Sequence, residues 1–406
     1  MKEISGGVVA AKGFKANGIH SGLRKQKERK DLALIVSDTL CTTASVYTTN
    51  LVKGAPIHVT KKHSLDGHAQ AIVCNSGNAN TCNADGIEKA EAMCEAVSKE
   101  TGIDVSNVLI ASTGVIGQVL DINPVKEHMK DLVAGLSNKE EASDLAWQAI
   151  STTDTKKKEI ALEFEVDGKV CHIGGICKGS GMIKPNMATM LCFITTDCAI
   201  SSAMLQKALS NVIVDTFNMV SVDGDTSTND TVTILANGLA GNKEITCEGK
   251  EYDEFYKALL AIATMLCKAI AKDGEGATKL LVVDVLNAKT MEDARVVAKS
   301  VVMSSLLKAA MFGADANWGR VLCAIGYSKA NVDITKVDVE FESKKGILPV
   351  CKNGAGIPFS EEKAKEILLE DEITIRCNLN DGSSNSQAFG CDLTYDYVKI
   401  NGDYRS

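Results

Sequence analysis

One threonine in this sequence stands where chemistry is possible. Thr189 lies near the end of the stretch Lys178–Leu191, which has the sequence KGSGMIKPNMATML. Two glycines, a proline and an asparagine make the first part of the stretch a loop. The apolar run Met190–Thr196 that follows predicts a buried strand. A hydroxyl group is therefore expected at the first position of a core strand, directly after a loop.

Two explanations fit this position. In the simpler one, Thr189 caps the strand at the end of a glycine-rich connection. In the other, the chain cuts itself between Ala188 and Thr189. The Thr189 hydroxyl attacks the Ala188 carbonyl, the peptide shifts to an ester, and water releases a new amino terminus. The product carries a hydroxyl and an α-amine on one residue. Because the amine titrates at about pH 8, it can accept the proton of that hydroxyl and activate it as a nucleophile.

The stretch Lys178–Leu191 resembles the signature of the ornithine acetyltransferase / glutamate N-acetyltransferase family of arginine biosynthesis, and the similarity extends from Gly6 to Ser406. The resemblance implies an acyltransferase that cuts itself before Thr189 and uses it to carry an acetyl group. N-acetylornithine would acetylate Thr189, and glutamate would then take the acetyl group in a ping-pong sequence.

The resemblance also implies roles for residues elsewhere in the chain. Thr113 and Gly114 follow a predicted strand and would form an oxyanion hole from the Thr side chain and the Gly N–H. Lys178 would pair with the substrate α-carboxylate, and Glu275 would bind its amino group. The implied substrate-binding set is Thr152, Lys178, Thr189, Glu275, Asn401 and Ser406. Taken alone, these residues have ordinary explanations, such as a surface lysine or a frayed tail.

The surrounding pattern predicts an α/β fold with mixed β-sheets sandwiched with helices, and a C-terminal α/β subdomain over about 286–406. A hairpin that turns at Asp167-Gly168 leads into the central stretch. Other strands are predicted over 31–37, 69–74, 107–114, 231–236 and 280–285. Helices are predicted over 85–99, 138–150, 201–217, 251–272 and 291–312, with one more that Asn123 caps and a glycine-rich turn over 313–319. Self-cleavage would give an N-terminal (alpha) chain 1–188 and a C-terminal (beta) chain 189–406.

Three other segments invite interpretation. The basic run Arg24–Lys30 favours a solvated loop. The loop Asn75–Asn80 follows a strand and either lines a site or is only a turn. The acidic segment Asp223–Asp230 suggests a calcium loop, but its sixth and twelfth positions are Thr228 and Ile234 instead of Gly and Glu, which excludes an EF-hand.

Composition narrows the class of protein. The chain has 406 residues, of which 45% are hydrophobic and 24% charged, as in ordinary globular enzymes. A net charge of −8 argues against a nucleic-acid partner. The apolar stretch Leu259–Ala271 contains Lys268 and is too short for a membrane span. With no signal peptide apparent, we expect a cytoplasmic protein without a membrane partner.

The fourteen cysteines form no Cys-x-x-Cys pair. Several, including Cys74, Cys192, Cys267 and Cys323, lie in apolar runs, so we interpret them as small buried hydrophobic residues and expect no metal site. The sequence has neither a P-loop nor a dinucleotide-binding fingerprint, and no cofactor is expected. All six histidines lie at or before His172, and none is placed near Thr189.

Two other function classes stay open at this stage. An N-terminal-nucleophile amidohydrolase or aminopeptidase would share the cleavage but pass its acyl group to water. A non-catalytic binding or assembly protein would stay uncut. Lys178, Glu275 and the Asn401–Ser406 tail favour a charged amino-acid acceptor. The resemblance implies that the two chains assemble as a heterotetramer of two alpha and two beta chains. The sequence leaves open whether acetyl-CoA is a second donor, which would make the enzyme multifunctional.

Overall fold

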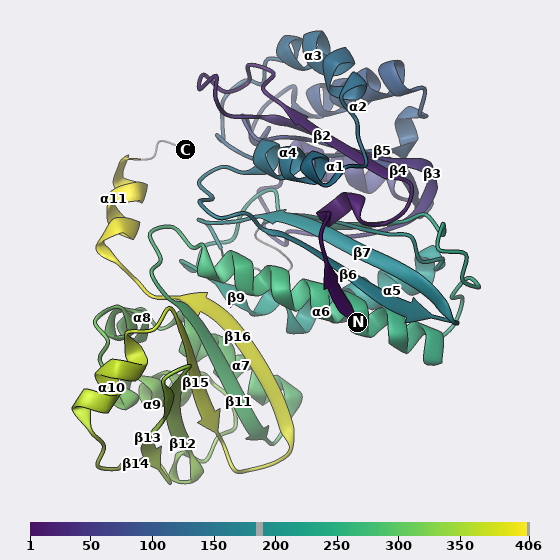
Figure 1. Ribbon diagram of the computed structural model, residues 1–406. Helices are drawn as coiled ribbons and strands as arrows, with labels where there is room; N and C mark the ends of the chain where they lie inside the picture. The colour runs from purple at the N-terminus through teal and green to yellow at the C-terminus, as the bar shows by residue number, and fades with distance from the viewer. Residues whose placement is uncertain (184–189, 404–406) are drawn as a thin grey trace.

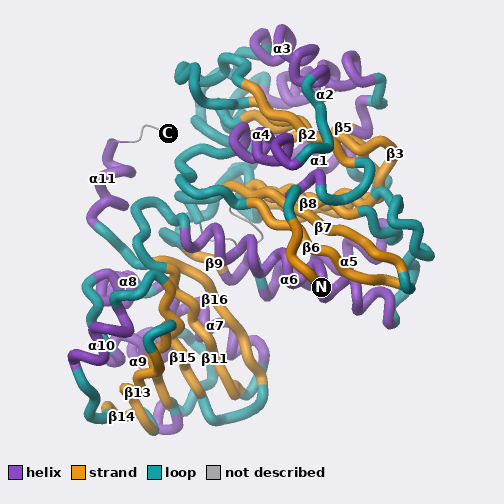
Figure 2. The backbone as a smooth tube through the Cα atoms, in the orientation of Figure 1, coloured by secondary structure: helices purple, strands orange, loops and turns teal. Residues whose placement is uncertain are grey.

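A computed structural model describes residues 1–183 and 190–403. Within these residues the chain forms two bodies, each built around one mixed sheet (Figure 1). The larger body holds a nine-stranded sheet and the smaller body a seven-stranded one. Helices cover both sheets, so the predicted α/β class with mixed sheets is confirmed (Figure 2).

The sheet of the larger body has its strands in the spatial order β1 (Lys2–Ile4), β6 (Glu159–Val166), β7 (Lys169–Lys178), β8 (Leu191–Thr196), β10 (Thr231–Ala236), β3 (Leu32–Tyr47), β4 (His68–Asn75) and β5 (Val108–Ser112), with β2 (Phe14–Ile19) paired to β3. β3 joins the two halves of this sheet. Its first part pairs with β2 and β4 and its last part with β10, with an irregularity after Val36.

Helices pack in three layers around this sheet. The helices of the larger body are α1 (Ala55–His63), α2 (Gly86–Thr101), α3 (Asn123–Ala134), α4 (Glu140–Ile150), α5 (Ser202–Asp215) and α6 (Lys250–Lys272). α1 and α2 pack against β5, and α3 packs on α2. α4 lies between β2 and β7, and α6 covers β6 and β7 (Figure 1). The buried face of α6 carries residues such as Phe255, Leu259 and Leu266, all without solvent exposure.

The sheet of the smaller body has the order β14 (Ala355–Gly356), β13 (Gly346–Lys352), β12 (Asp338–Ser343), β15 (Glu372–Asn378), β11 (Leu280–Ala288), β16 (Ser384–Cys391) and β9 (Val220–Ser221). Its helices are α7 (Met291–Met303), α8 (Ser305–Phe312), α9 (Trp318–Gly326) and α10 (Glu361–Leu368). The last helix, α11 (Tyr395–Asp403), buries none of its residues and stands beside both bodies (Figure 1).

The hairpin before the central stretch forms as predicted. β6 and β7 pair in antiparallel register up to Val166 and Lys169. The two residues between them have positive φ, 53° at Asp167 and 68° at Gly168. This is the turn geometry that matches the twist of a two-residue hairpin, and Asp-Gly is one of the pairs that adopts it. The hairpin carries β7 to Lys178, at the entrance of the central stretch.

Three local predictions are wrong. The helix expected over 291–312 is two helices, because Ser304 ends α7 and its side chain accepts the Leu307 N–H to cap α8. The turn expected over 313–319 gives way to α9 from Trp318. Asn123 is the first helical residue of α3 and not its cap.

The cysteines follow the prediction with one exception among those named. Cys74, Cys192 and Cys267 are fully buried free thiols, whereas Cys323 is exposed on α9. Burial raises the pKa of the Cys74 thiol to about 12, so it stays protonated and inert at neutral pH.

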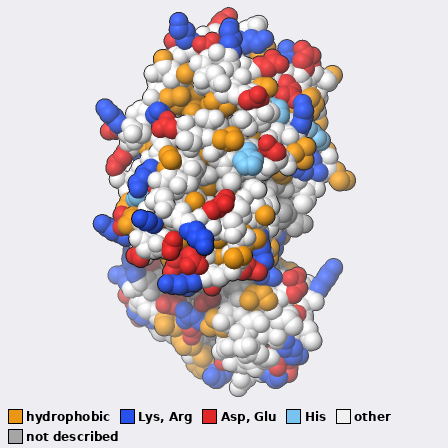
Figure 3. Space-filling model, turned by 90° about the vertical axis from the view of Figure 1, so that its right-hand side faces the viewer, with side chains coloured by type: hydrophobic (Ala, Val, Ile, Leu, Met, Phe, Trp, Pro, Cys, Tyr) orange, Lys and Arg blue, Asp and Glu red, His pale blue; other side chains and the backbone are white. Residues whose placement is uncertain are grey.

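Acidic and basic side chains are interspersed over the face seen in Figure 3. None of the helices described for residues 1–183 and 190–403 is long and apolar enough to cross a bilayer.

Candidate active site

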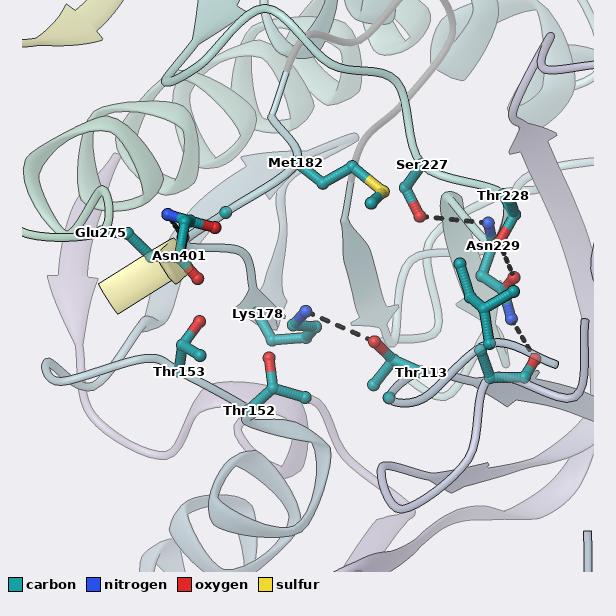
Figure 4. Close-up of a pocket in the computed structure, with 14 residues that line it drawn as sticks. Thr113, Thr152, Thr153, Lys178, Met182, Ser227, Thr228, Asn229, Glu275 and Asn401 are labelled. Carbon is teal, nitrogen blue, oxygen red and sulfur yellow. Dashed lines mark hydrogen bonds between the residues drawn. The ribbon is translucent and has the colours of Figure 1, made fainter. Parts of the chain in front are cut away.

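A cavity of about 220 Å³ lies where the loops of the larger body meet α11. Among the predicted site residues, it brings together Thr113, Gly114, Thr152, Lys178, Glu275 and Asn401 (Figure 4). Its other lining residues are Ala79, Ile116, Thr153, Gly181, Met182, Ser227, Thr228 and Asn229. The remaining predicted positions, Ala188, Thr189 and Ser406, lie outside the described residues.

Thr113 and Gly114 form one wall of the cavity, at the carboxyl end of β5. The Thr113 N–H donates to the Asn75 carbonyl at 2.9 Å, which continues the pairing of β4 with β5 by one residue. Gly114 has φ 121°, and a Cβ there would meet the backbone of Gly77 at 2.9 Å. Only glycine fits this position. Within the described residues the Gly114 N–H has no acceptor, so it is available to a ligand.

Lys178 is the buried cation of the cavity. It ends β7, and its Nζ donates to the Thr113 hydroxyl at 3.4 Å (Figure 4). Burial lowers the pKa of Lys178, while the nearby carboxylate of Asp154 acts to raise it. Because Lys178 occupies a lone pair of the Thr113 oxygen, the hydroxyl proton of Thr113 is free to point at another acceptor.

The opposite wall carries a carboxylate, Glu275, in the loop between α6 and β11. Its N–H donates to the Ser180 carbonyl at 3.0 Å, and its side chain lies directly over Gly181. A Cβ at Gly181 would collide with that carboxylate, so the glycine is required by the close approach. Asn401 of α11 donates its Nδ2 to Glu275 Oε2 at 2.8 Å. This bond holds α11 at the cavity.

A buried ion network ties three loops of the site together. Lys158 has no solvent exposure, and its Nζ contacts Asp154 at 2.6 Å and also contacts Asp273. Asp154 accepts the N–H groups of Thr152 and Gly179, at 3.0 and 2.9 Å. Asp273 holds the 155–156 backbone and lies two residues before Glu275. The network therefore fixes the segments that carry Thr152, Lys178 and Glu275.

Replacing Lys158 by methionine is expected to destabilise the protein by about 3–5 kcal/mol, because removing one partner leaves buried carboxylates without a cation. Urea unfolding at pH 7 measures the change. Lys157→Met is the matched control: its side chain is 47% exposed and pairs with Asp144 and Glu159 at the surface. That control should cost less than about 1 kcal/mol. Equal losses in both variants would refute a structural role for the buried network.

The network also predicts acid sensitivity. Burial alone would raise the pKa of Asp154, but Lys158 and Lys178 lower it to about 2, below the usual value near 4. A depressed pKa means that Asp154 stabilises the fold above about pH 4 and that this contribution is lost as the pH falls towards 2. In Lys158→Met, Asp154 loses the cation that lowers its pKa most and takes up a proton more readily. The stability gap to the wild type should therefore narrow between about pH 7 and 4.

The basic run Arg24–Lys30 is a loop with residues 25–29 exposed, as predicted, but two of its arginines also reach the segments of the site. Arg24 donates to the Ser76 carbonyl and, at 2.8 Å, to the Ser151 carbonyl. Arg29 donates to the Thr152 carbonyl at 2.6 Å. Arg24 therefore connects the 75–80 loop to the 151–155 cluster, and Arg29 adds a contact between the basic run and that cluster. No signal in the sequence separates these two residues from the other basic residues of the run.

The 75–80 loop does line the cavity, through Ala79, and Asn229 holds it in place. The Asn229 Nδ2 donates to the carbonyls of Ala79 and Ser112, at 2.5 and 2.8 Å, and its Oδ1 accepts from Thr81 at 2.7 Å. One buried amide thus fixes the two segments that flank Thr113. The sequence did not single out Asn229, which lies inside the hydroxyl-rich segment considered for calcium.

The chain on both sides of residues 184–189 is tied to one segment, 222–231. Asp223 accepts the N–H groups of Met182 and Ile183, each at 2.7 Å. On the other side the Thr231 N–H donates to the Met190 carbonyl at 2.9 Å. Asp223 therefore acts as a backbone anchor.

Among the described residues no cluster of three or more His, Cys, Asp or Glu side chains could hold a metal ion.

Comparisons with known proteins give one consistent result. A model described as the ArgJ family matches residues 15–406. The arginine biosynthesis bifunctional protein ArgJ of Caldanaerobacter subterraneus subsp. tengcongensis is 49% identical over 100% of both chains. The protein of the same name from Bacillus subtilis is 46% identical over 100% of this chain and 98% of its own.

A solved structure agrees with these relatives. The crystal structure of the arginine biosynthesis bifunctional protein from Bacillus halodurans is 48% identical to this chain, with a TM-score of 0.51. The match covers 53% of this chain and 100% of the solved one. On the family model and on relatives matched over their whole length, this chain belongs to the ArgJ family, the ornithine acetyltransferase family that its Lys178–Leu191 stretch resembles.

Proposed function

We propose that this protein moves an acetyl group from N-acetylornithine to glutamate through an acetyl ester on Thr189. The observation that carries the proposal is a single cavity that holds an oxyanion-type donor pair, a buried cation and a carboxylate on different walls. The names of the relatives support arginine biosynthesis as the setting. An α-amino acid with a cationic side chain fits these charges.

In this proposal Lys178 pairs with the α-carboxylate of the substrate. Its pKa is lowered by burial, which disfavours its charged form, so an anionic partner in the cavity stabilises the ammonium group. Glu275 takes the side-chain ammonium of N-acetylornithine, and Asn401 orients the Glu275 carboxylate. Thr152 also lines the cavity and offers a further hydroxyl contact.

The transfer takes two balanced steps. The Thr189 oxygen bonds to the acetyl carbon and its proton passes to the Thr189 α-amine. Thr113 and Gly114 donate to the oxygen that becomes negative. The carbon–nitrogen bond of the amide then breaks, and the departing ornithine nitrogen takes the proton from the α-amine. Glutamate reverses the sequence: its amine attacks the ester, and the Thr189 oxygen recovers a proton.

The α-amine used in these steps requires self-cleavage between Ala188 and Thr189. Two observations support it. The described residues on both sides of 184–189 are anchored to 222–231, Met182 and Ile183 through Asp223 and Met190 through Thr231. The solved ArgJ chain from Bacillus halodurans, matched over its whole length, corresponds to only 53% of this chain. Residues 189–406 are likewise a little over half of it, as expected if the relative consists of two polypeptides.

We further propose that the products, residues 1–188 and 189–406, stay together, with a C-terminal subdomain over about 286–406, and that they assemble as two alpha and two beta chains. Size-exclusion chromatography with light scattering, combined with a denaturing gel, tests both points. A mass near four fragments with two bands on the gel is expected. A single band at full length would refute the division into two chains.

The test of the activity is an assay of the purified protein with N-acetylornithine and glutamate, with and without acetyl-CoA. Formation of N-acetylglutamate and ornithine in equal amounts supports the transferase. Release of acetate with no acetylated glutamate would support a hydrolase in its place. Because the relatives are named bifunctional, acetyl-CoA is the second donor to test. Acetylation of glutamate from acetyl-CoA alone would establish it.

Glu275→Gln is expected to raise the KM for N-acetylornithine by about 10- to 100-fold, the effect of losing one charge-assisted hydrogen bond of about 1.5–3 kcal/mol. The KM for glutamate should not rise, because its side chain is anionic and gains nothing from the Glu275 charge. Steady-state kinetics with each substrate varied separately measures the two values.

The matched control for this variant is Glu362→Gln, which removes the same charge from an exposed position of α10, outside the cavity. It should leave both KM values within about twofold of the wild type, as expected for a screened surface charge. If Glu275→Gln changed the KM for both substrates equally, Glu275 would not be the ligand of the ornithine ammonium.

A further inference from the structure

The proposed reaction brings two side chains of opposite charge to one place. Lys178 pairs with the α-carboxylate of either substrate, and the α-nitrogen of either one exchanges the acetyl group. The side-chain ammonium of N-acetylornithine and the side-chain carboxylate of glutamate lie the same number of bonds from Cα. Both charged groups therefore reach the same wall of the cavity, which carries the Glu275 carboxylate. Glu275 attracts the ammonium group but repels the carboxylate of glutamate.

No second cation of the cavity offsets this repulsion. Among the described residues that line it, Lys178 is the only lysine or arginine, and in the proposed reaction it pairs with the α-carboxylate. Asn401 has no spare donor, because its Nδ2 already donates to Glu275 Oε2 at 2.8 Å and to the Tyr397 carbonyl at 3.1 Å. The side-chain carboxylate of glutamate therefore needs another hydrogen-bond donor next to Glu275.

Thr153 has a hydroxyl group in the right place for this task. The residue is half-buried, and among the described residues only Thr153 and Glu275 line both the main cavity and a neighbouring cavity of about 440 Å³. Figure 4 shows the Thr153 hydroxyl directed towards the pair formed by Glu275 and Asn401. Within the part of the chain that the structure describes, this hydroxyl has no hydrogen-bond partner. It is therefore available to a ligand.

The buried ion network fixes the segment that carries Thr153. Asp154 accepts the Thr152 N–H at 3.0 Å, and Asp273 accepts the Thr155 N–H at 3.0 Å and also the Thr155 hydroxyl. Both carboxylates contact the Lys158 ammonium group. The chain is thus held on both sides of Thr153 before a substrate binds, so little further ordering is needed when the hydroxyl takes part in binding.

A hydroxyl group suits both substrates because it has one O–H donor and two acceptor lone pairs. We propose that Thr153 is the specificity-determining residue that lets one wall bind both side chains. Its oxygen accepts a hydrogen bond from the ammonium group of N-acetylornithine beside Glu275. After rotation about the C–O bond, its O–H donates to the side-chain carboxylate of glutamate and offsets the repulsion by Glu275. This inference rests on the proposed function.

The test is Thr153→Val, which removes the hydroxyl and keeps the branched shape of the side chain. In a ping-pong sequence each substrate meets its own form of the enzyme, so kcat/KM for each substrate reports its own half-reaction. Loss of a hydrogen bond to a charged group should lower kcat/KM for glutamate by about 10-fold or more. The value for N-acetylornithine should fall by less than about threefold, because Glu275 still binds its ammonium group. Thr153→Ser keeps the hydroxyl and should stay within about threefold of the wild type for both substrates.

Thr39→Val is the matched control, because Thr39 is exposed on β3 and lines neither cavity. It should leave both kcat/KM values within about twofold of the wild type. Urea unfolding checks that Thr153→Val is folded, and Thr153→Ala, with the same expected result, replaces it if it is not. Equal losses for the two substrates, a larger loss for N-acetylornithine or no loss at all would overturn the inference. A wild-type protein that forms no N-acetylglutamate from N-acetylornithine and glutamate would instead overturn the proposed function.

Discussion

Thr189→Ala is expected to give one uncut chain of 406 residues without transferase activity. The substitution removes the hydroxyl that attacks the Ala188 carbonyl, so no new amino terminus forms, and it removes the atom that would carry the acetyl group. Activity should fall below detection, because nucleophile and base disappear together. A denaturing gel and the N-acetylornithine–glutamate assay measure both losses.

Thr189→Ser is the control for this prediction. It keeps the hydroxyl and should retain part of the cleavage and activity, although without the β-methyl group the hydroxyl is less firmly held in one rotamer. With N-acetylornithine and no acceptor, mass spectrometry of the wild type should find one acetyl group on the fragment that begins Thr-Met-Leu. A fully active protein that is still a single chain, or an acetyl group on another residue, would contradict the mechanism.

Thr113→Ala is expected to slow transfer by about 10²–10³ in kcat, the usual effect of removing one oxyanion donor. The Lys178 contact leaves the Thr113 proton free to donate into the cavity, and the variant loses that donor. The neighbouring Gly114 N–H is unaffected, so some transfer remains. Rapid-mixing measurements of acetyl-enzyme formation isolate this step from product release.

The conservative variant Thr113→Ser keeps the hydroxyl. Its kcat should stay within about tenfold of the wild-type value, a smaller loss than the removal of an oxyanion donor causes. Thr113→Ala should leave the unfolding midpoint close to the wild-type value, because its backbone bond to Asn75 is kept. A loss of less than about threefold in Thr113→Ala, far below the usual effect, would show that Thr113 is only the end of β5.

Local pattern was enough to predict most elements that position the site. The alternation of Thr231–Ala236 predicted β10 with both ends correct, and Asp167-Gly168 predicted the hairpin. The break between α7 and α8 was missed because apolar residues recur at helical spacing on both sides of Ser304, so the pattern looks like one continuous helix. Its capping role depends on the hydrogen bond it makes to Leu307, and a helical pattern alone does not signal that bond.

The supports of the site could not be predicted in the same way. Lys156, Lys157 and Lys158 look alike in the sequence, yet only Lys158 of the three is buried. Its partner Asp273 lies 115 residues away. Asp230 and Asn229 likewise belong to an acidic, hydroxyl-rich segment whose composition suggests a loop. Which member of such a run enters the interior is decided by long-range packing, which periodicity does not report.

The pairing of β7 with β8 affects how the protein can refold before and after the proposed cut. These strands lie on either side of the proposed cut and form an antiparallel ladder from Ile173–Thr196 to Lys178–Leu191. Before the cut, both strands belong to one polypeptide and find each other in a unimolecular reaction. After it, a thermally denatured sample must regain that ladder by a bimolecular encounter. The rate at which native protein re-forms after heating should then fall on dilution. The lifetime of the active protein at high temperature therefore depends on how slowly the native state unfolds.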